Sequence, residues 1–294
     1  MLVKFILPLL LISTAALAKT TFTYKGGESV DDRRQHYLQQ VLTLALNKTV
    51  DEFGDFELVS AAEGLNLARV LRQLDEQAYS NFFVRVSMTD VFASKYSAVP
   101  FPIDRGVSGY RIALVQNGKE REWCGDEQIN IEKYSIVQGL AWLDVDILRA
   151  NNLQVYDSSS YDNMFEMINA GRMDMFFRSI NEINDEYSIK SQNLKGLKIE
   201  PCIALYYPLP RFFITNKDNQ VNAQRIYLGL SRAYKDGSFQ TLWDQFFGQS
   251  RGLMQLKQRR IITLDNPFIK NLNKDYEQYN FVMSEYLEGT PVSK

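Results

Sequence analysis

The segment 161–182 places an arginine where a bound anion would meet it. Its first half has the apolar spacing of a helix that ends at Gly171, and Met173 to Phe177 is typical of a buried strand. Arg178 and Ser179 follow this strand directly. In an open α/β sheet, polar groups at the carboxyl end of a strand face the crevice where ligands bind. The sequence therefore predicts that Arg178 and Ser179 contact a ligand.

The chemistry open to Arg178 is anion recognition, because a planar guanidinium pairs well with a carboxylate or a phosphate. An internal salt bridge to Glu182 or Glu186 is the alternative.

Two further expected strands end in polar residues that would face the same crevice. Thr89 and Asp90 follow the strand expected at 81–88, and Tyr24 and Lys25 end the strand expected at 21–24. A solvated lysine on a glycine loop is the alternative for Lys25.

A fourth candidate is the run Gly139 to Trp142, which lies between an expected strand and an expected helix. Backbone N–H groups at a helix N-terminus suit an anion. Trp142 has the alternative role of packing within or between lobes.

Enzyme and metal motifs are missing from this sequence. His36 is its single histidine, so a multi-histidine metal site is excluded, and any histidine-dependent triad would need this residue. Neither a phosphate-binding P-loop nor a G-x-G-x-x-G turn occurs, so no cofactor is expected. Asp90 and Glu182 are the candidates for a general acid or base if the chain were an enzyme.

These candidate residues depend on alternating strands and helices for their positions. Strands are expected at 21–24, 56–59 and 81–88, with helices between them, which favours an α/β sheet with crossover connections. Pro100, Pro102 and Gly106 then punctuate a crossing segment, and a second α/β region follows before a return crossing near 203–215. A chain that crosses out and back in this way predicts a two-lobed clamshell with a ligand cleft.

The first 18 residues predict a secretory signal peptide. Lys4 precedes an apolar run, and Ala16 to Ala18 fits a cleavage site before Lys19. Since residue 19 is not cysteine, no lipid anchor is expected. Without Lys4, 32 basic side chains face 35 acidic ones, a formal charge of −3 that gives no support for nucleic-acid binding.

The two cysteines, Cys124 and Cys202, would enter an oxidising compartment after export. They could form one disulfide or remain two separate, partly buried thiols. Sequence spacing does not decide between these alternatives.

Several passages of the mature chain resemble the family 3 extracytoplasmic solute-binding proteins, which have the type II periplasmic-binding fold. The elements that carry this resemblance are 21–28, PFPIDRGVSGYRIALV (100–115), GRMD (171–174) and 203–215. A branch described only as transporter substrate-binding domains is similar at YLQQVLTLALNKT (37–49), INAGRMDMFFRSINEI (168–183) and RIYLGLSRAYKDGSFQTLW (225–243).

Two departures from the amino-acid binders of this family concern charge. Their third strand usually ends in T-x-x-R, whose arginine holds the ligand α-carboxylate, whereas here Thr89 is followed by Asp90, Val91 and Phe92. They also place an aspartate for the ligand ammonium close to the position of Arg178. The inverted pattern speaks against an ordinary α-amino acid as the ligand.

The resemblance implies a monomeric, non-enzymatic periplasmic protein with an α/β, two-lobed type II clamshell and two crossing hinge strands. We expect lobe 1 at 19–105 and 206–294 and lobe 2 at 106–205. The expected function is to close on a small polar, anionic or zwitterionic solute for an ABC permease or a membrane sensor. The alternatives are a non-transport interaction or signalling module and a dehydratase- or lyase-like enzyme.

Overall fold

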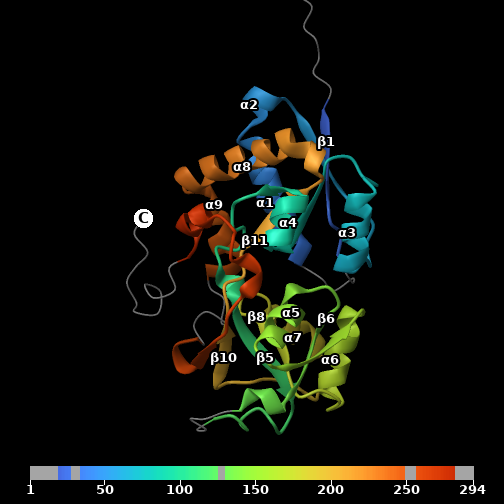
Figure 1. Cartoon of the computed structure of the whole chain (residues 1–294), viewed down its shortest axis with the longest axis vertical. Helices are drawn as coiled ribbons and strands as arrows, with labels where there is room; N and C mark the ends of the chain where they lie inside the picture. The colour runs from blue at the N-terminus through green and yellow to red at the C-terminus, as the bar shows by residue number, and fades with distance from the viewer. Residues whose placement is uncertain (1–18, 28–33, 125–129, 249–255, 282–294) are drawn as a thin grey trace, which may run out of the picture.

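The computed structural model describes residues 19–27, 34–124, 130–248 and 256–281. The expected signal peptide at 1–18 therefore lies outside the described residues. Figure 1 shows two bodies, one above the other, with the N-terminal helices and α8 around the upper sheet and α5 to α7 around the lower one. None of the described helices is long and apolar enough to span a bilayer.

The first sheet has five strands in the order β2-β1-β3-β11-β4. β1 is parallel to β2 and β3, whereas β11 runs antiparallel to β3 and β4. The strands of this sheet are β1 (Thr20–Tyr24), β2 (Phe56–Ser60), β3 (Phe82–Ser87), β4 (Ser97–Val99) and β11 (Arg211–Thr215).

Helices on this sheet follow from the chain's apolar spacing and caps. α3 begins after Asn66, whose side chain accepts the Arg69 N–H, and it buries Val70 and Leu74. The helices of this part are α1 (Arg34–Asn47), α2 (Val50–Phe53), α3 (Leu67–Asp75), α4 (Asp90–Lys95), α8 (Gln220–Lys235) and α9 (Ser238–Trp243).

The second sheet is built on β5, which pairs antiparallel with β8, β9 and β10. β12 adds to β10 as a parallel edge strand, and β6 and β7 form a separate parallel pair that an Ile136–Met175 bridge joins to the segment before β8. The strands are β5 (Tyr110–Gln116), β6 (Ser135–Gly139), β7 (Gln154–Ser158), β8 (Phe176–Ser179), β9 (Leu197–Ile199), β10 (Ile203–Tyr206) and β12 (Arg260–Thr263). The helices are α5 (Leu143–Ala150), α6 (Tyr161–Asn169) and α7 (Ile183–Lys190).

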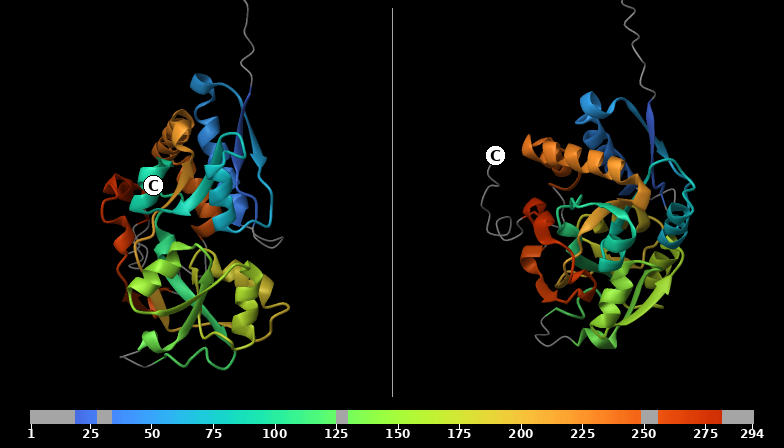
Figure 2. Two further views of the ribbon diagram at one scale, coloured as in Figure 1. Left: turned by 45° about the vertical axis from the view of Figure 1, so that its right-hand side comes forward. Right: turned by 45° about the horizontal axis from the view of Figure 1, so that its top comes forward.

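The chain passes between the sheets after β4 and returns between β10 and β11, and backbone hydrogen bonds tie these two crossings together. Ile103 N–H donates to Arg211 O at 3.1 Å, and Tyr207 N–H donates to Gly109 O at 3.2 Å. These crossings match the out-and-back path expected from the sequence. The C-terminal segment makes a third passage, because β12 pairs within the second sheet (Figure 2). The lobe boundaries given above stay a prediction.

The helix expected before Gly171 is present as α6. Ser160 caps α6 by accepting the Asn163 N–H, and Gly171 after the helix has φ 67°, the left-handed conformation that favours glycine. The strand that follows lies further along than predicted. β8 spans Phe176 to Ser179, so Arg178 lies inside the strand, paired with Ile112, rather than beyond its end. The sequence-based boundary was wrong because nearby carboxylates allow the charged residue to be buried.

Asp174, of the GRMD element, fastens the second sheet to its neighbouring pair of strands. Its Oδ2 accepts hydrogen bonds from Ser135 N at 2.9 Å and Ser135 Oγ at 2.7 Å, and Lys119 Nζ lies 3.2 Å from Oδ1. Burial alone would raise the pKa of Asp174, but these hydrogen bonds outweigh burial and lower the pKa below its ordinary value of 3.8.

Replacement Asp174→Asn is expected to lower the free energy of unfolding by about 1–2 kcal/mol at pH 7, since the hydrogen bonds lose their charge. Because the folded-state pKa is the lower one, this stability is complete above the unfolded-state pKa and is lost as the pH falls through the folded-state value. Urea unfolding at pH 7 and at several pH values below 4 should therefore show that the difference in unfolding free energy between wild type and Asp174→Asn becomes smaller as the pH falls. Asp157→Asn on β7 is the exposed control, and a difference that did not change with pH would contradict the prediction.

Candidate ligand-binding cleft

A cavity of about 440 Å³ lies between the two sheets. From the side of the first sheet, Lys25 after β1, Arg85 on β3 and Thr89 at the start of α4 line it; Trp142 and Arg178 line it from the second. Pro267 and Phe268, from the C-terminal segment, complete part of the wall. A site built from both sheets is suited to a ligand that holds the two bodies together.

Five of the residues predicted from the sequence line this cavity: Lys25, Thr89, Asp90, Trp142 and Arg178. Lys25 and Thr89 follow the ends of β1 and β3, as the strand-end argument requires, whereas Arg178 lies within β8. Whether any of them contacts a ligand stays a prediction.

Tyr24, Gly139 and Ser179 do not belong to the cavity lining. Tyr24 is half-buried and packs against the hydrophobic core, and the Ser179 hydroxyl, fully buried, bonds to Asn181 Oδ1. Gly139 has a positioning role, because a Cβ at this residue would lie 2.3 Å from the Trp142 ring. Glycine therefore allows Trp142 to lie close against the end of β6.

The turn from Gly139 to Trp142 offers fewer anion-binding groups than expected. Leu140 N–H donates to Ser158 O at 2.8 Å and Trp142 N–H donates to Gly139 O at 3.0 Å. Both donors are therefore used within the protein, and α5 begins only at Leu143. The Trp142 ring instead lies 4.8 Å from the Arg178 guanidinium, a cation–π distance.

Thr89 and Asp90 also have partners within the chain. Thr89 caps α4, its hydroxyl accepting the Phe92 N–H at 3.0 Å. The Asp90 carboxylate accepts hydrogen bonds at 3.1 Å from the backbone and side-chain amides of Asn271. Asp90 therefore anchors the C-terminal segment beside the cavity.

Arg178 is 1% exposed and makes the internal salt bridges that were its alternative role. Its guanidinium contacts Glu186 at 2.6 Å and 2.7 Å and Glu182 at 2.7 Å. Burial alone would lower the pKa of Arg178, but the two carboxylates outweigh it and raise the pKa. Arg178 thus has a structural role in addition to its position on the cavity wall.

Glu182 connects the two sheets. One of its oxygens contacts Arg178 on β8, and the other lies 3.0 Å from Arg211 Nη1 on β11 and 3.6 Å from Arg85 Nη1 on β3. Glu182 is 6% exposed, so solvent screens these pairs weakly. One carboxylate of the protein thus occupies the centre of an arginine cluster that borders the cavity.

A second buried ion pair lies beside the cavity, on the side of the second sheet. Arg111 of β5 lies 2.7 Å from Asp144, and the Tyr207 hydroxyl donates to the same carboxylate at 2.5 Å. Burial raises the pKa of Tyr207 well above its ordinary value; the Arg111 charge opposes this rise and the Asp144 charge adds to it. Asp144, although it lines the cavity, is thereby already paired with a positive charge of the protein.

Arg85 and Arg211 were missed by the sequence analysis. Each leaves a signal: Arg85 interrupts the apolar strand FFVRVS, and Arg211 stands between Pro210 and Phe212 at the return crossing. A charged residue within a buried strand marks either an internal ion pair or a ligand site.

No protein-family model and no curated protein sequence matches this chain. Solved structures with the same fold do match, and the chain has the two-lobed α/β fold of the type II periplasmic-binding proteins. An arginine-specific periplasmic binding protein from Salmonella typhimurium aligns at a TM-score of 0.57 and 12% identity, covering 78% of this chain and 100% of that one.

Two further neighbours show the range of proteins with this fold. A structure reported for glutathione import through the cystine ABC importer of Streptococcus mutans aligns at a TM-score of 0.55 and 16% identity, covering 79% of this chain and 97% of that one. An ancestral amino-acid-binding protein, described as a precursor of cyclohexadienyl dehydratase, aligns at a TM-score of 0.53 and 12% identity. The alignment covers 78% of this chain and 95% of that one. At these identities the likeness establishes the fold.

Proposed function

We propose that this chain is an extracytoplasmic solute-binding protein whose two lobes close on a small anionic or zwitterionic solute. The observation that carries the proposal is the 440 Å³ cavity between the sheets, whose charged lining comprises Lys25, Arg85, Arg178 and Arg211 beside Asp90, Asp144 and Asp146. Solute binding by several structural neighbours supports the same role. A permease or a membrane sensor would then recognise the closed form, and the expected leader would deliver the chain to the periplasm.

Binding in this scheme shifts an equilibrium between open and closed forms. A ligand carboxylate or phosphate would contact the arginines at the border of the cavity, and the Trp142 ring would cover one face of the ligand. The Glu182 carboxylate already balances part of the positive charge of these arginines. The solute must therefore offer more contacts than Glu182 alone, which favours ligands with two or more polar groups.

Thermal unfolding against a panel of organic acids, amino acids, short peptides and phosphorylated metabolites tests the proposal. The protein is first unfolded and refolded to remove co-purified solute. A ligand present at about a hundred times its dissociation constant adds about 2.7 kcal/mol to the folded state. We expect hits among anionic or zwitterionic compounds. Hits confined to neutral compounds would contradict the proposed solute class. If no compound raised the melting temperature, an interaction module would be favoured.

Replacement Glu182→Gln is expected to tighten binding of an anionic hit about tenfold, or about 1.4 kcal/mol, because the competing charge is removed while the side-chain shape is kept. Calorimetric titration of wild type and variant measures the effect. Glu166→Gln, on the exposed face of α6, is the matched control. Weaker binding by Glu182→Gln would show instead that Glu182 organises the arginines for the ligand.

A further inference from the structure

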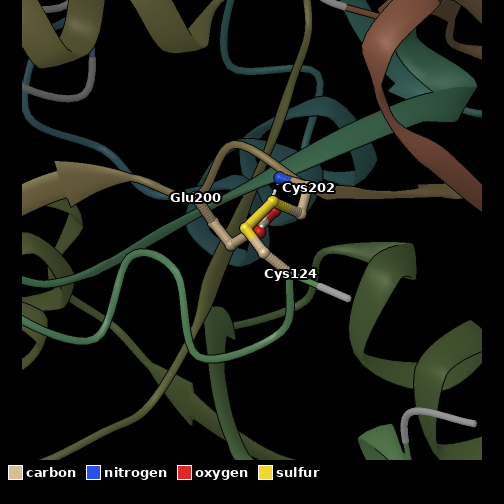
Figure 3. Close-up of side chains that lie close together, drawn as sticks. All are labelled: Cys124, Glu200 and Cys202. Atoms are coloured by element: carbon tan, nitrogen blue, oxygen red, sulfur yellow. Dashed lines mark hydrogen bonds between the residues drawn. A yellow bond between two sulfur atoms is a disulfide. The ribbon is translucent and has the colours of Figure 1, made fainter. Parts of the chain in front are cut away.

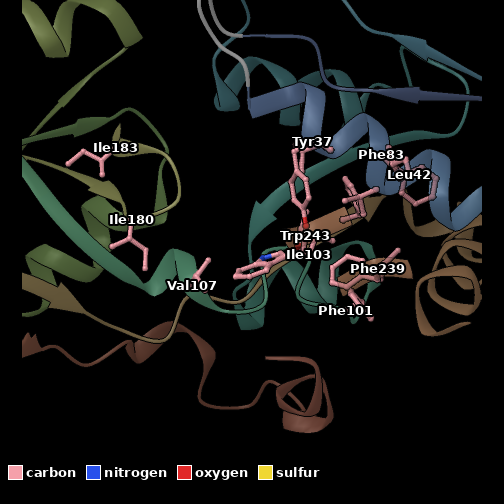
Figure 4. Packing of buried hydrophobic residues seen from close by; sticks show 14 of the residues in the cluster. Tyr37, Leu42, Phe83, Phe101, Ile103, Val107, Ile180, Ile183, Phe239 and Trp243 are labelled. Carbon is pink, nitrogen blue, oxygen red and sulfur yellow. Dashed lines mark hydrogen bonds between the residues drawn. The ribbon is translucent and has the colours of Figure 1, made fainter. Parts of the chain in front are cut away.

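A second cavity, of about 360 Å³, lies beside the first and shares Leu38 and Arg85 with it. α1, the outgoing crossing and the segment after α9 form one side, and α6 and α7 form the other. Its lining comprises His36, Tyr37, Leu38, Arg85, Ile103, Asp104, Tyr161, Asn181, Glu182, Asp185, Glu186, Ile189, Phe246 and Phe247. Figure 4 shows Tyr37 and Ile103 near Trp243, with Val107 toward Ile180 and Ile183 of the other body.

Asp104 is the unusual residue of this second cavity. Its side chain is 2% exposed, and its Oδ2 has no hydrogen-bond partner within the described part of the chain. Oδ1 accepts the Gly106 N–H at 3.3 Å, and Arg211 Nε lies 3.8 Å from Oδ2. Buried carboxylates are normally hydrogen-bonded, because an unsatisfied one is costly. Asp104 therefore leaves an acceptor at the wall of a cavity.

Aromatic rings form the adjoining wall. Tyr37 lies 5.1 Å from Phe246 and 4.7 Å from Phe247, and His36 lies 5.6 Å from Phe246, measured between ring centroids. The Tyr37 hydroxyl is bonded to Ile103 O, so the ring presents carbon to its surroundings. Rings of this kind attract organic cations through the negative potential of their faces.

The other charges around this cavity are largely balanced. Glu186 is paired with Arg178 and also accepts the Tyr161 hydroxyl at 2.6 Å, and Glu182 is shared among arginines. Arg85 is the cation of the described lining, and Glu182 lies beside it. Asp185, exposed on α7, adds negative charge at the rim.

We propose that the second cavity binds an organic cation, namely a primary ammonium carried on an apolar body. The ammonium donates to Asp104 Oδ2, and the body packs against the rings of Tyr37, Phe246 and Phe247. The two cavities then differ in composition: Lys25, Arg178 and Arg211 line only the first, together with three aspartates, whereas these two phenylalanine rings and Asp104 line only the second. Binding here stands apart from the proposed anion site, because Asp104 and both phenylalanines are outside the first cavity's lining.

The test is calorimetric titration of the refolded protein with 2-phenylethylammonium, with 2-phenylethanol as the uncharged analogue. Wild type should bind the amine and show at least tenfold weaker binding of the alcohol. Asp104→Asn should weaken amine binding at least tenfold, and Asp157→Asn should change it less than twofold. Phe246→Ala, at a half-buried ring, gives a second test if Asp104→Asn does not fold.

Equal binding of amine and alcohol, or unchanged amine binding in both Asp104→Asn and Phe246→Ala, would overturn the inference. So would no binding by wild type. The same proteins titrated with an anionic hit separate this outcome from the proposed function. Amine binding without any anion binding would support the second site and contradict the proposed anion site. Anion binding without any amine binding would support the anion site and overturn the present inference.

Discussion

Replacement Arg178→Ala is expected to lower the free energy of unfolding by about 3–5 kcal/mol, because it leaves Glu182 and Glu186 buried beside a missing positive charge. The three hydrogen bonds of 2.6–2.7 Å that Arg178 donates to them would all be lost. Urea unfolding followed by circular dichroism measures the change. Arg172→Ala, at an exposed arginine on the preceding turn, is the matched control and should cost less than about 0.5 kcal/mol.

A compensating variant separates charge from packing in this result. Arg178→Met combined with Glu186→Leu replaces a buried pair by apolar groups and should recover much of the lost stability, as such replacements often do. Failure to recover any stability would show that cavity formation, rather than uncompensated charge, dominates. Loss of ligand binding in Arg178→Ala would not by itself identify a ligand contact, because the same replacement removes a buried ion pair.

Loss of the disulfide is expected to cost about 4 kcal/mol, from the conformational entropy that the bridge removes from the unfolded chain. Cys124 and Cys202 are bonded and lie 78 residues apart in sequence, so the closed loop is long (Figure 3). Cys124→Ser with Cys202→Ser should lower the midpoint of urea unfolding accordingly. A loss below 1 kcal/mol would show that the unfolded chain is already restricted in this region.

The environment of the disulfide explains why its loss would affect the second sheet. Glu200, buried beside it, accepts the N–H groups of Cys202 and Ile203 and pairs with Arg259 at 3.1 Å. Burial raises the pKa of Glu200 despite these partners. Cys124, Glu200 and Cys202 lie close enough together to suggest a metal site, but the two sulfurs are bonded to each other and offer no thiolates.

The sequence predicted the alternation of elements and the crossings, because apolar spacing, caps and glycine stops are local features. Gly171 is an example, because it ends the helix that immediately precedes it. It also predicted one ligand cleft for eight residues, of which Lys25, Thr89, Asp90, Trp142 and Arg178 line the cavity, and their contact with a ligand stays a prediction.

Strand pairings and ion pairs between segments far apart in the sequence could not be predicted from local sequence patterns. The pairing of β12 with β10 joins segments more than fifty residues apart, and Glu182 meets Arg85 and Arg211 across two sheets. Local spacing also left open whether Arg178 serves a ligand or an internal pair. In the structure it pairs internally and still borders the cavity, so the two roles are not exclusive.

Tryptophan fluorescence tests the central claim, that a solute binds in the cavity between the sheets, most directly. Trp142 lines that cavity, whereas Trp123 and Trp243 are 2% and 1% exposed within the hydrophobic cores. Titration with an anionic or zwitterionic solute should give a saturable change in wild type that is lost in Trp142→Phe, while that variant keeps a ligand-induced rise in melting temperature. A fluorescence change that persists in Trp142→Phe, or the absence of any saturable change across the panel, would contradict the account.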